Sequence, residues 1–296
     1  MASLRGLKKI IKSQMPESIL RPLVLLILIL LVFLFQKKQL DATMGIRLHL
    51  ISIIVAYSFG MYWLQIEKPR ELKQIKPIYK TKEWFHEALP YFLLGGISII
   101  NSKLSMVLSG VFLPIEEVGF YKIAVVGSSL VSFLLISVNT SIGPLIGEMY
   151  YGNRKKELQK MLTKTVQIVS LIGFVISIIY VFLGKFFIDL VYGTEYAPAY
   201  TPLIILTIGH LINASAGSVQ TILSMTGNQR NILRGQIIAA LLNIVLNCFL
   251  LPFFGIVGGA IATSISLMVW NIILVREVKI KLGLNSSILN SKIKEI

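Results

Sequence analysis

Cysteine, histidine and acidic residues are all scarce in this 296-residue sequence. It contains one cysteine, three histidines and 14 aspartates and glutamates. A single cysteine excludes a disulfide framework, and because Cys248 lies within an apolar run we expect it to be a small buried hydrophobic residue. His49, His86 and His210 are far apart and are interpreted as isolated residues in polar or interfacial positions. Because no metal-ligand cluster, nucleotide-binding loop or nucleophile–base pair is visible, the sequence predicts neither an enzyme nor a bound cofactor.

Apolar residues, by contrast, dominate the composition. The sequence is 55% hydrophobic and 15% charged, and its mean hydropathy of +0.76 is far above that of a soluble globular domain. A formal net charge of +15 would suit a nucleic-acid-binding protein. Here, however, the basic residues lie in short segments between long apolar runs. We therefore expect an all-α integral membrane protein whose partners include membrane lipids and no nucleic acid.

Eight apolar segments are predicted to cross the bilayer as helices. The first is slightly shorter than the ~20 residues that a bilayer core requires, so we expect neighbouring residues to complete it. The last carries small residues at every fourth position, among them Gly258, Ala262 and Ser266, which would permit close helix packing. The expected spans cover residues 21–35, 42–64, 89–113, 119–146, 166–184, 202–225, 232–251 and 256–275.

The basic residues predict which segments lie inside the cell. Residues 65–87 carry six lysines and arginines between two apolar regions, and Pro69 and Pro77 interrupt any continuous helix there. Positive charge of this kind favours the cytoplasmic face, where anionic lipids attract it. With both termini inside, about four-fifths of the 29 lysines and arginines fall in predicted cytoplasmic segments. The loop at Lys73 and the turn at Gly152 are then cytoplasmic, and Glu116 and Glu195 are external.

Few cations lie inside the predicted spans, and Lys103 is the deepest of them. It lies ten residues from the outer end at Leu113, which is about 15 Å at 1.5 Å per residue. A charge near the midplane is costly unless it faces water or a partner, and no acidic residue is expected mid-span to pair with it. We therefore expect an aqueous cavity that receives an anion, with Asn101 on a neighbouring face. The shallower Lys122 and Arg47 complete the candidate site, although Arg47 could instead extend to the membrane surface.

A weak internal repeat suggests two lobes. The segments that start SLRGLKKII and GNQRNILRG are each a basic lead-in, followed by an apolar span, a short outer turn and a returning span. Internal duplication is common in transporters. On this interpretation the first two spans end a first lobe that lacks four initial spans, and we expect that the chain would not transport alone. The predicted domains are the end of the first lobe (1–65), a basic cytoplasmic linker (66–87), the second lobe (88–278) and a basic cytoplasmic tail (279–296).

Three blocks resemble one known family, and the likeness covers nearly the whole chain. Residues 226–275, which begin TGNQRNILRG, look like the final helix pair of polysaccharide flippases. Residues 118–162 (VGFYKIAVV to NRKKELQKML) resemble the second span of that family's C-terminal lobe with its cytoplasmic helix, and residues 5–23 (RGLKKIIKSQMPESILRPL) resemble the approach to its fifth helix. These are the exporters of O-antigen and related lipid-linked oligosaccharides, in the superfamily that includes MATE drug exporters and lipid II flippases. The resemblance implies a MATE-like, two-lobed architecture with about eight transmembrane helices and an incomplete first lobe.

The resemblance also implies a function. The chain would flip undecaprenyl-diphosphate-linked oligosaccharide repeat units across the bacterial cytoplasmic membrane by alternating access, for the biosynthesis of O-antigen, capsule or exopolysaccharide. The diphosphate would bind the candidate cations, and a polysaccharide polymerase and a chain-length regulator would be further partners. Two alternatives stay open. A cation-coupled drug exporter would be expected to keep a buried carboxylate, and an inactive truncated scaffold could serve a polysaccharide-assembly complex.

Overall fold

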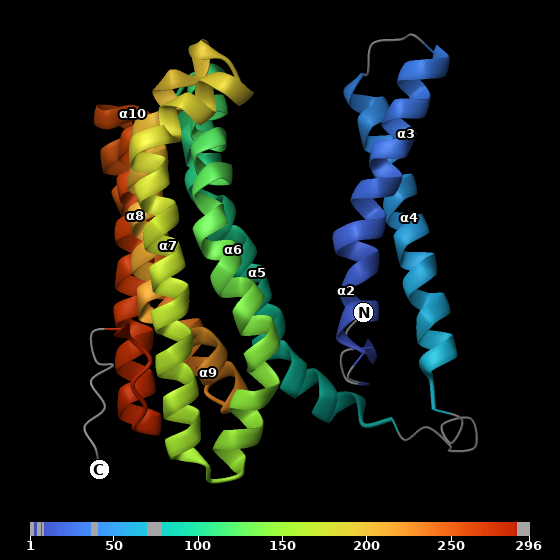
Figure 1. The fold of residues 1–296 in the computed structure, drawn as a ribbon, viewed down its shortest axis with the longest axis vertical. Helices are drawn as coiled ribbons and strands as arrows, with labels where there is room; N and C mark the ends of the chain where they lie inside the picture. The colour runs from blue at the N-terminus through green and yellow to red at the C-terminus, as the bar shows by residue number, and fades with distance from the viewer. Residues whose placement is uncertain (1–2, 5–6, 8, 37–40, 70–78, 289–296) are drawn as a thin grey trace. The chain divides into compact units, whose positions relative to one another are not determined.

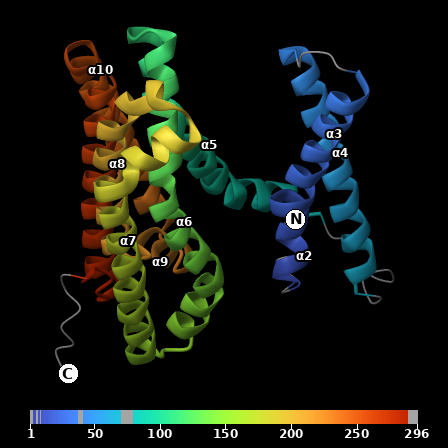
Figure 2. The ribbon, with the colours of Figure 1, turned by 45° about the horizontal axis from the view of Figure 1, so that its top comes forward.

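The computed structural model consists of two compact units, Met1–Tyr79 and Lys80–Ile296. It describes residues 3–4, 7, 9–36, 41–69 and 79–288. Every regular element within these residues is helical (Figures 1 and 2), and seven helices are long and apolar enough to cross a membrane. The predicted all-helical membrane architecture is thereby confirmed. Much of the predicted basic linker, including Lys73, and the end of the predicted tail lie outside the described residues.

The first unit is a pair of antiparallel helical rods. One rod joins α2 (Ile10–Met15), a single π-helical turn η1 (Pro16–Leu20) and α3 (Arg21–Gln36); the other is α4 (Ala42–Glu67). Proline has no backbone N–H and crowds the preceding turn, which favours a wider turn at Pro16, and the Arg21 N–H bonds to the Pro16 carbonyl. The first apolar helix covers Ile11–Leu34 and so starts before the predicted residue 21. This agrees with the expectation that neighbouring residues complete the short first span.

Small side chains, ion pairs and a polar contact hold the two rods together. Ser52 and Ala56, one turn apart on α4, are almost completely buried, so the rods can approach closely. At one end Glu67 forms ion pairs with Lys12 and, at 3.2 Å, with Lys9. Farther along, an Arg21 guanidinium nitrogen lies 2.7 Å from Nε2 of His49, and these contacts fix the register of the rods.

The second unit is a bundle of long helices. Helices α6 and α7 both extend beyond the predicted spans. In α7 the extension is the amphipathic basic segment that contains Lys160, which forms the N-terminal part of the helix. The bundle is made of α5 (Thr81–Phe112), α6 (Ile115–Tyr151), α7 (Lys155–Val191), the short 3₁₀ helix η3 (Thr194–Ala199), α8 (Tyr200–Ala216), α9 (Val219–Met225) and α10 (Gln229–Leu282).

Helix α10 is a hairpin of two antiparallel halves. Within its 54 residues Gly255 has φ 55° and ψ −141°, which is not helical. A β-carbon on Gly258 would lie 2.2 Å from the carbonyl oxygen of Leu250, although these residues would be far apart in one straight helix. Near the open ends of the hairpin, the Asn231 amide donates a hydrogen bond to Glu277. The two halves correspond to the seventh and eighth predicted spans, and their close packing at Gly258 confirms the role expected of the small residues.

The sixth predicted span is broken rather than continuous. Helix α8 ends at Ala216, and Gly217 takes a φ of 79° before α9 begins. A side chain at residue 217 would also clash, because its β-carbon would lie 2.4 Å from the backbone carbonyl oxygen of Ser286. The residues next to the break include Ser215, Ser218 and Gln220, but the apolar stretches on either side of them made residues 202–225 look like one span.

The turns of the second unit gather at its two ends. The Gln159 side chain and the backbone of Asn285 exchange hydrogen bonds of 2.7 and 2.8 Å, so the first turns of α7 lie beside the residues that follow α10. At the other end, a carboxylate oxygen of Glu117 lies 3.1 Å from where a β-carbon on Gly255 would be, so the first turn of α6 lies beside the turn of the α10 hairpin. Since α6 runs the length of the bundle between these regions (Figure 1), the segments predicted inside and those predicted outside lie at opposite ends.

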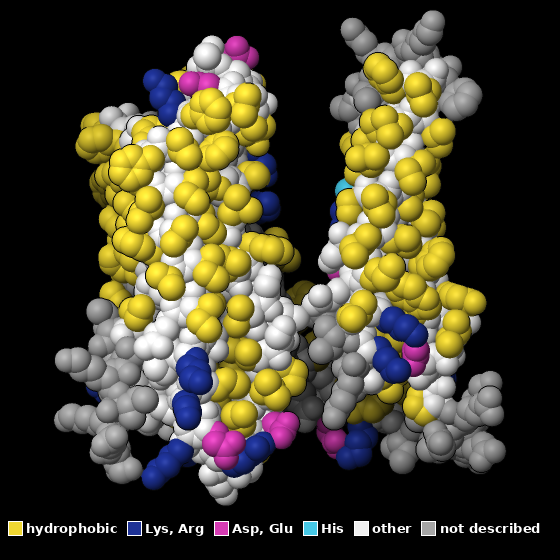
Figure 3. All heavy atoms as spheres, in the orientation of Figure 1, with side chains coloured by type: hydrophobic (Ala, Val, Ile, Leu, Met, Phe, Trp, Pro, Cys, Tyr) yellow, Lys and Arg dark blue, Asp and Glu magenta, His cyan; other side chains and the backbone are white. Residues whose placement is uncertain are grey.

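The outer surface is strongly apolar. In Figure 3 hydrophobic side chains cover the middle of the visible face of the second unit, and charged side chains lie mainly near its ends. Phe133, Phe174 and Phe182 are all more than half exposed. Cys248 is exposed too, so the expectation of a buried residue was wrong. On its helix it lies beside the buried face that carries Asn243 and Asn247. A membrane accommodates an apolar side chain at such a position. The chain is a multi-pass membrane protein.

Candidate functional site

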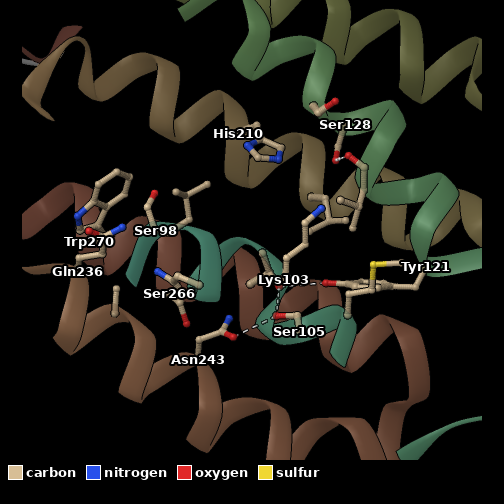
Figure 4. Close-up of a pocket in the computed structure, with 18 of the residues that line it drawn as sticks. Ser98, Lys103, Ser105, Tyr121, Ser128, His210, Gln236, Asn243, Ser266 and Trp270 are labelled. Carbon is tan, nitrogen blue, oxygen red and sulfur yellow. Dashed lines mark hydrogen bonds between the residues drawn. The ribbon is translucent and has the colours of Figure 1, made fainter. Parts of the chain in front are cut away.

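A partly open cavity of about 320 Å³, to which many polar side chains contribute, lies in the second unit. Its walls come from α5, α6, α8 and both halves of α10 (Figure 4). Its polar lining residues are Ser98, Asn101, Lys103, Ser105, Tyr121, Lys122, Ser128, Ser129, His210, Gln236, Asn243, Thr263, Ser266 and Trp270.

The cavity lies along the helices at membrane depth. On α5 its lining runs from Ser98 to Met106, within the apolar segment Gly95–Phe112. On the second half of α10 it runs from Thr263 to Trp270. At 1.5 Å per residue both lining segments are about 10–12 Å long. A polar space of this length inside apolar helices can hold a charged group and a neighbouring ring.

Three of the four residues predicted from the sequence line this cavity. Lys103, Asn101 and Lys122 come from α5 and α6, and the Lys103 side chain extends toward the side of the cavity where His210 and Ser128 lie (Figure 4). No described lining residue is acidic, so the two lysines make the lining cationic. The fourth, Arg47, is an exposed residue of α4 in the first unit, and its participation stays a prediction.

A hydrogen-bonded network forms the wall beside Lys103. The Ser105 hydroxyl lies 3.1 Å from Oδ1 of Asn243 and 2.7 Å from the hydroxyl of Thr263. The Tyr121 hydroxyl lies 3.0 Å from the same Thr263 hydroxyl, and the Asn247 amide donates to Ser105 over 3.2 Å. The network links α5, α6 and both halves of α10. Because buried polar groups that satisfy one another stiffen their surroundings, it holds this wall in one arrangement.

His210 lines the cavity, although no sequence pattern grouped it with other residues. Its Nδ1 lies 2.7 Å from the hydroxyl of Ser132, so α8 is tied to α6 and the ring stays beside the cavity. His49 contacts Arg21 in the other unit. His49 and His210 are therefore separate and each has a polar partner, as predicted. Of the two, His210 borders the cavity. The His86 side chain lies outside the described residues.

Gln236 and Trp270 are lining residues that the sequence interpretation missed. Figure 4 shows them at one end of the cavity, with Tyr121 at the other end and Lys103 between. They lie on the two halves of α10, which the hairpin brings together. One signal was available: a glutamine within an apolar span is costly and therefore worth explaining. The sequence could not show that the tryptophan faces the same space.

The lining can bind a particular kind of molecule. Lysine ammonium groups attract anions, and the hydroxyls and amides offer both donors and acceptors to a polar ligand. No group of three His, Cys, Asp or Glu residues that could hold a metal ion occurs in the part of the chain that the structure describes. The arrangement thus suits binding of an anion that carries hydroxyl-rich groups.

Comparison with known proteins identifies similar chains. The MatE family profile matches residues 96–249. The chain is 24% identical over 243 residues to the probable low-salt glycan biosynthesis flippase Agl15 of Haloferax volcanii, covering 80% of this chain and 49% of that protein. It is also 24% identical over 247 residues to the capsular polysaccharide biosynthesis protein CapF of Staphylococcus aureus, covering 80% and 60%. The chain thus spans about half the length of the curated relatives it matches.

A solved structure shares the fold. The lipid II flippase MurJ in its inward closed conformation superposes with a TM-score of 0.63 at 16% sequence identity. The match covers 88% of this chain and 54% of that one. At this identity the likeness concerns the fold, and it confirms the predicted MATE-like helical fold.

Proposed function

The chain belongs to the MatE family, and from this premise we propose that it flips lipid-diphosphate-linked oligosaccharides across a membrane. Relatives whose names describe flippases and capsule biosynthesis support this proposal. The specific substrate we propose is an undecaprenyl-diphosphate-linked repeat unit of O-antigen, capsule or exopolysaccharide. The lipid would stay in the bilayer while its charged and sugar-bearing head occupies the polar cavity.

The cationic lining of the cavity is the observation that carries the proposal. Lys103 and Lys122 are exposed residues that line the open cavity along apolar segments of α5 and α6, and a charge there is costly in a bilayer unless it faces water or a partner. A diphosphate would compensate both charges, and Asn101 would donate a further hydrogen bond to it. A drug exporter coupled to a cation would be expected to use a buried carboxylate, and the described lining has none. Arg47 remains in the proposal as a fourth contact.

We further propose how the chain works in its membrane. The cavity would open to the two sides in turn, as alternating access requires. The ends that carry Lys155 and Asn285 would face the cytoplasm of a bacterium, because basic segments favour that side. The first two spans would belong to one lobe and the remaining six to another. A polysaccharide polymerase and a chain-length regulator are proposed as the proteins that receive the flipped unit.

A binding measurement tests the charge of Lys103. The 296-residue chain in lipid nanodiscs is titrated with farnesyl diphosphate, a short lipid diphosphate. Lys103→Met should weaken binding about 10- to 100-fold, the effect of losing a charge-assisted contact, whereas Lys103→Arg should retain most of the affinity. Lys164→Met, the same change at an exposed position of α7, should bind like the wild type. Normal binding by Lys103→Met would show that the lysine does not hold the anion.

Translocation needs its own measurement. Proteoliposomes that contain the chain and a fluorescent lipid-diphosphate-linked sugar are treated with an impermeant quencher, which destroys only the fluorescence of the outer leaflet. Flipping by the chain would raise the quenched fraction above that of protein-free vesicles. Binding without any rise would agree with the expectation that these 296 residues do not transport alone, and a rise would refute that expectation.

A further inference from the structure

The two ends of the cavity have different chemistry. Two cations, Lys103 and Lys122, line the cavity, and Lys103 lies near its middle (Figure 4). Figure 4 places Gln236 and Trp270 at one end, with Ser98 nearby, and all three are neutral. An anion alone would be held by the cationic region. The neutral end must therefore be explained by another part of a ligand or by the packing of the helices.

Packing does not explain the Gln236 amide. The residue is only 4% exposed, and among the described residues its Oε1 has no hydrogen-bond partner. Nearly all buried polar atoms are satisfied, because an unsatisfied one costs about 1–3 kcal/mol. Ten buried side-chain atoms of the described residues lack a partner, and of these only Oε1 of Gln236 and Nε1 of Trp270 belong to residues that line the cavity.

Trp270 presents a complementary atom at the same end. Its Nε1 is buried and has no hydrogen-bond partner among the described residues, and its indole borders the cavity. An acceptor on Gln236 and a donor on Trp270 therefore lie together on the two halves of the α10 hairpin. The face of an indole is electron-rich and attracts weakly positive C–H bonds. A buried acceptor, a buried donor and an aromatic face are together suited to a neutral ring that carries hydroxyls.

We propose that Gln236 and Trp270 form a sugar subsite, which binds the sugar attached directly to the diphosphate. This inference rests on the proposed function. A sugar hydroxyl would donate to Oε1 of Gln236, the Trp270 N–H would donate to a sugar oxygen, and the C–H face of the ring would pack on the indole. Ser98 and Lys103 are five residues apart on α5, about 7.5 Å along the helix, so one ligand can reach both regions.

The subsite would determine which head groups bind well. A site that hydrogen-bonds a hydroxyl discriminates strongly against ligands that lack it, because its own buried groups are then left unpaired. The cationic region, in contrast, would accept any lipid diphosphate. Affinity for the lipid diphosphate and preference for the sugar should consequently depend on different residues.

Two ligands and two variants separate these contributions. The chain in nanodiscs is titrated with farnesyl diphosphate and with farnesyl-diphosphate-linked N-acetylglucosamine. The wild type should bind the sugar-bearing ligand at least about fivefold more tightly, the effect of about one net hydrogen bond. Gln236→Leu should remove that preference, whereas Lys103→Met should weaken the binding of both ligands and keep the preference. Gln220→Leu, the same substitution at an exposed position of α9, should behave like the wild type.

Fluorescence gives a second measurement that does not require a cavity variant. Trp270 is the one of the three tryptophans that lines the cavity within the second unit, and a Trp63→Phe, Trp84→Phe protein reports on Trp270 alone. The sugar-bearing ligand should change the emission of Trp270, and farnesyl diphosphate should change it much less.

The possible failures are distinguishable. If the wild type binds both ligands equally and the Trp270 emission responds equally, the sugar subsite is refuted while the proposed function survives. If neither ligand binds, the proposed function fails and the subsite fails with it. If Gln236→Leu weakens both ligands by the same factor, Gln236 supports the fold of the cavity and does not recognise the sugar.

Discussion

Ser105 has more partners in the polar network than any other described side chain, and so tests what the network contributes. Its hydroxyl contacts Asn243, Asn247 and Thr263 at 3.1, 3.2 and 2.7 Å, and it is only 6% exposed. We expect Ser105→Ala to lower the free energy of unfolding by roughly 1–2 kcal/mol, since it removes bonds that the remaining groups cannot replace. Thermal unfolding in detergent, followed by circular dichroism, measures this loss.

Ser137 provides the matched control for that substitution. It is exposed on α6, and its hydroxyl bonds only to the Phe133 carbonyl one turn earlier, over 2.8 Å. Ser137→Ala should change stability by less than about 0.5 kcal/mol. Equal unfolding temperatures for the two variants would mean that the network adds nothing to stability.

At the scale of single elements, the α10 hairpin depends on the absence of a side chain at Gly258. A β-carbon there would lie 2.2 Å from the Leu250 carbonyl oxygen, so the two halves must separate to admit it. Gly258→Ala should therefore destabilise the protein by about 1–3 kcal/mol or more, as overpacking does. The same unfolding measurement applies. A lower yield of folded protein would be a second sign of this clash.

Gly110 offers the opposite environment within α5. No atom lies within 4 Å of a β-carbon built there, and the residue is exposed. Gly110→Ala should be neutral or slightly stabilising, because alanine favours a helix more than glycine does. A wild-type unfolding temperature for Gly258→Ala would show that the hairpin relaxes easily at its turn. In that case the close approach of its halves would not constrain the cavity either.

At the scale of the whole molecule, the proposed orientation is testable by labelling. Cys248 is the only cysteine in the sequence, so Cys248→Ser gives a background in which one new cysteine reports one position. Glu195→Cys, in η3, should react with an impermeant maleimide on intact cells. Lys155→Cys, at the start of α7, should react only after permeabilisation, because positive charge favours the cytoplasmic side.

Each other labelling pattern has a clear meaning. The reverse pattern would contradict the orientation while leaving the fold unchanged. Labelling of both positions from the same side would contradict a membrane-crossing α7, since its two ends would then share one face. Both residues are exposed, so lack of access within the protein would not explain a negative result.

The sequence by itself determined where this protein crosses the membrane. Hydrophobic runs and basic clusters are properties of consecutive residues, so most of the apolar helices and the turn at Gly152 could be predicted without a fold, and the depth of Lys103 in the membrane stays a prediction. Lys103 in particular was identifiable because a lone cation in an apolar helix is costly wherever the helix packs. The resemblance to polysaccharide flippases was carried by the order of these same segments.

Only the tertiary structure decided which polar side chains share a cavity. Ser105, Tyr121, His210 and Gln236 each occur as single polar residues in apolar helices, and the helix that carries Gln236 lies more than a hundred residues beyond α5. Their meeting depends on how α5, α6 and α8 pack against the two halves of α10. That packing is set by close contacts between distant residues, such as those of Thr263 with Ser105 and Tyr121, which no local pattern encodes.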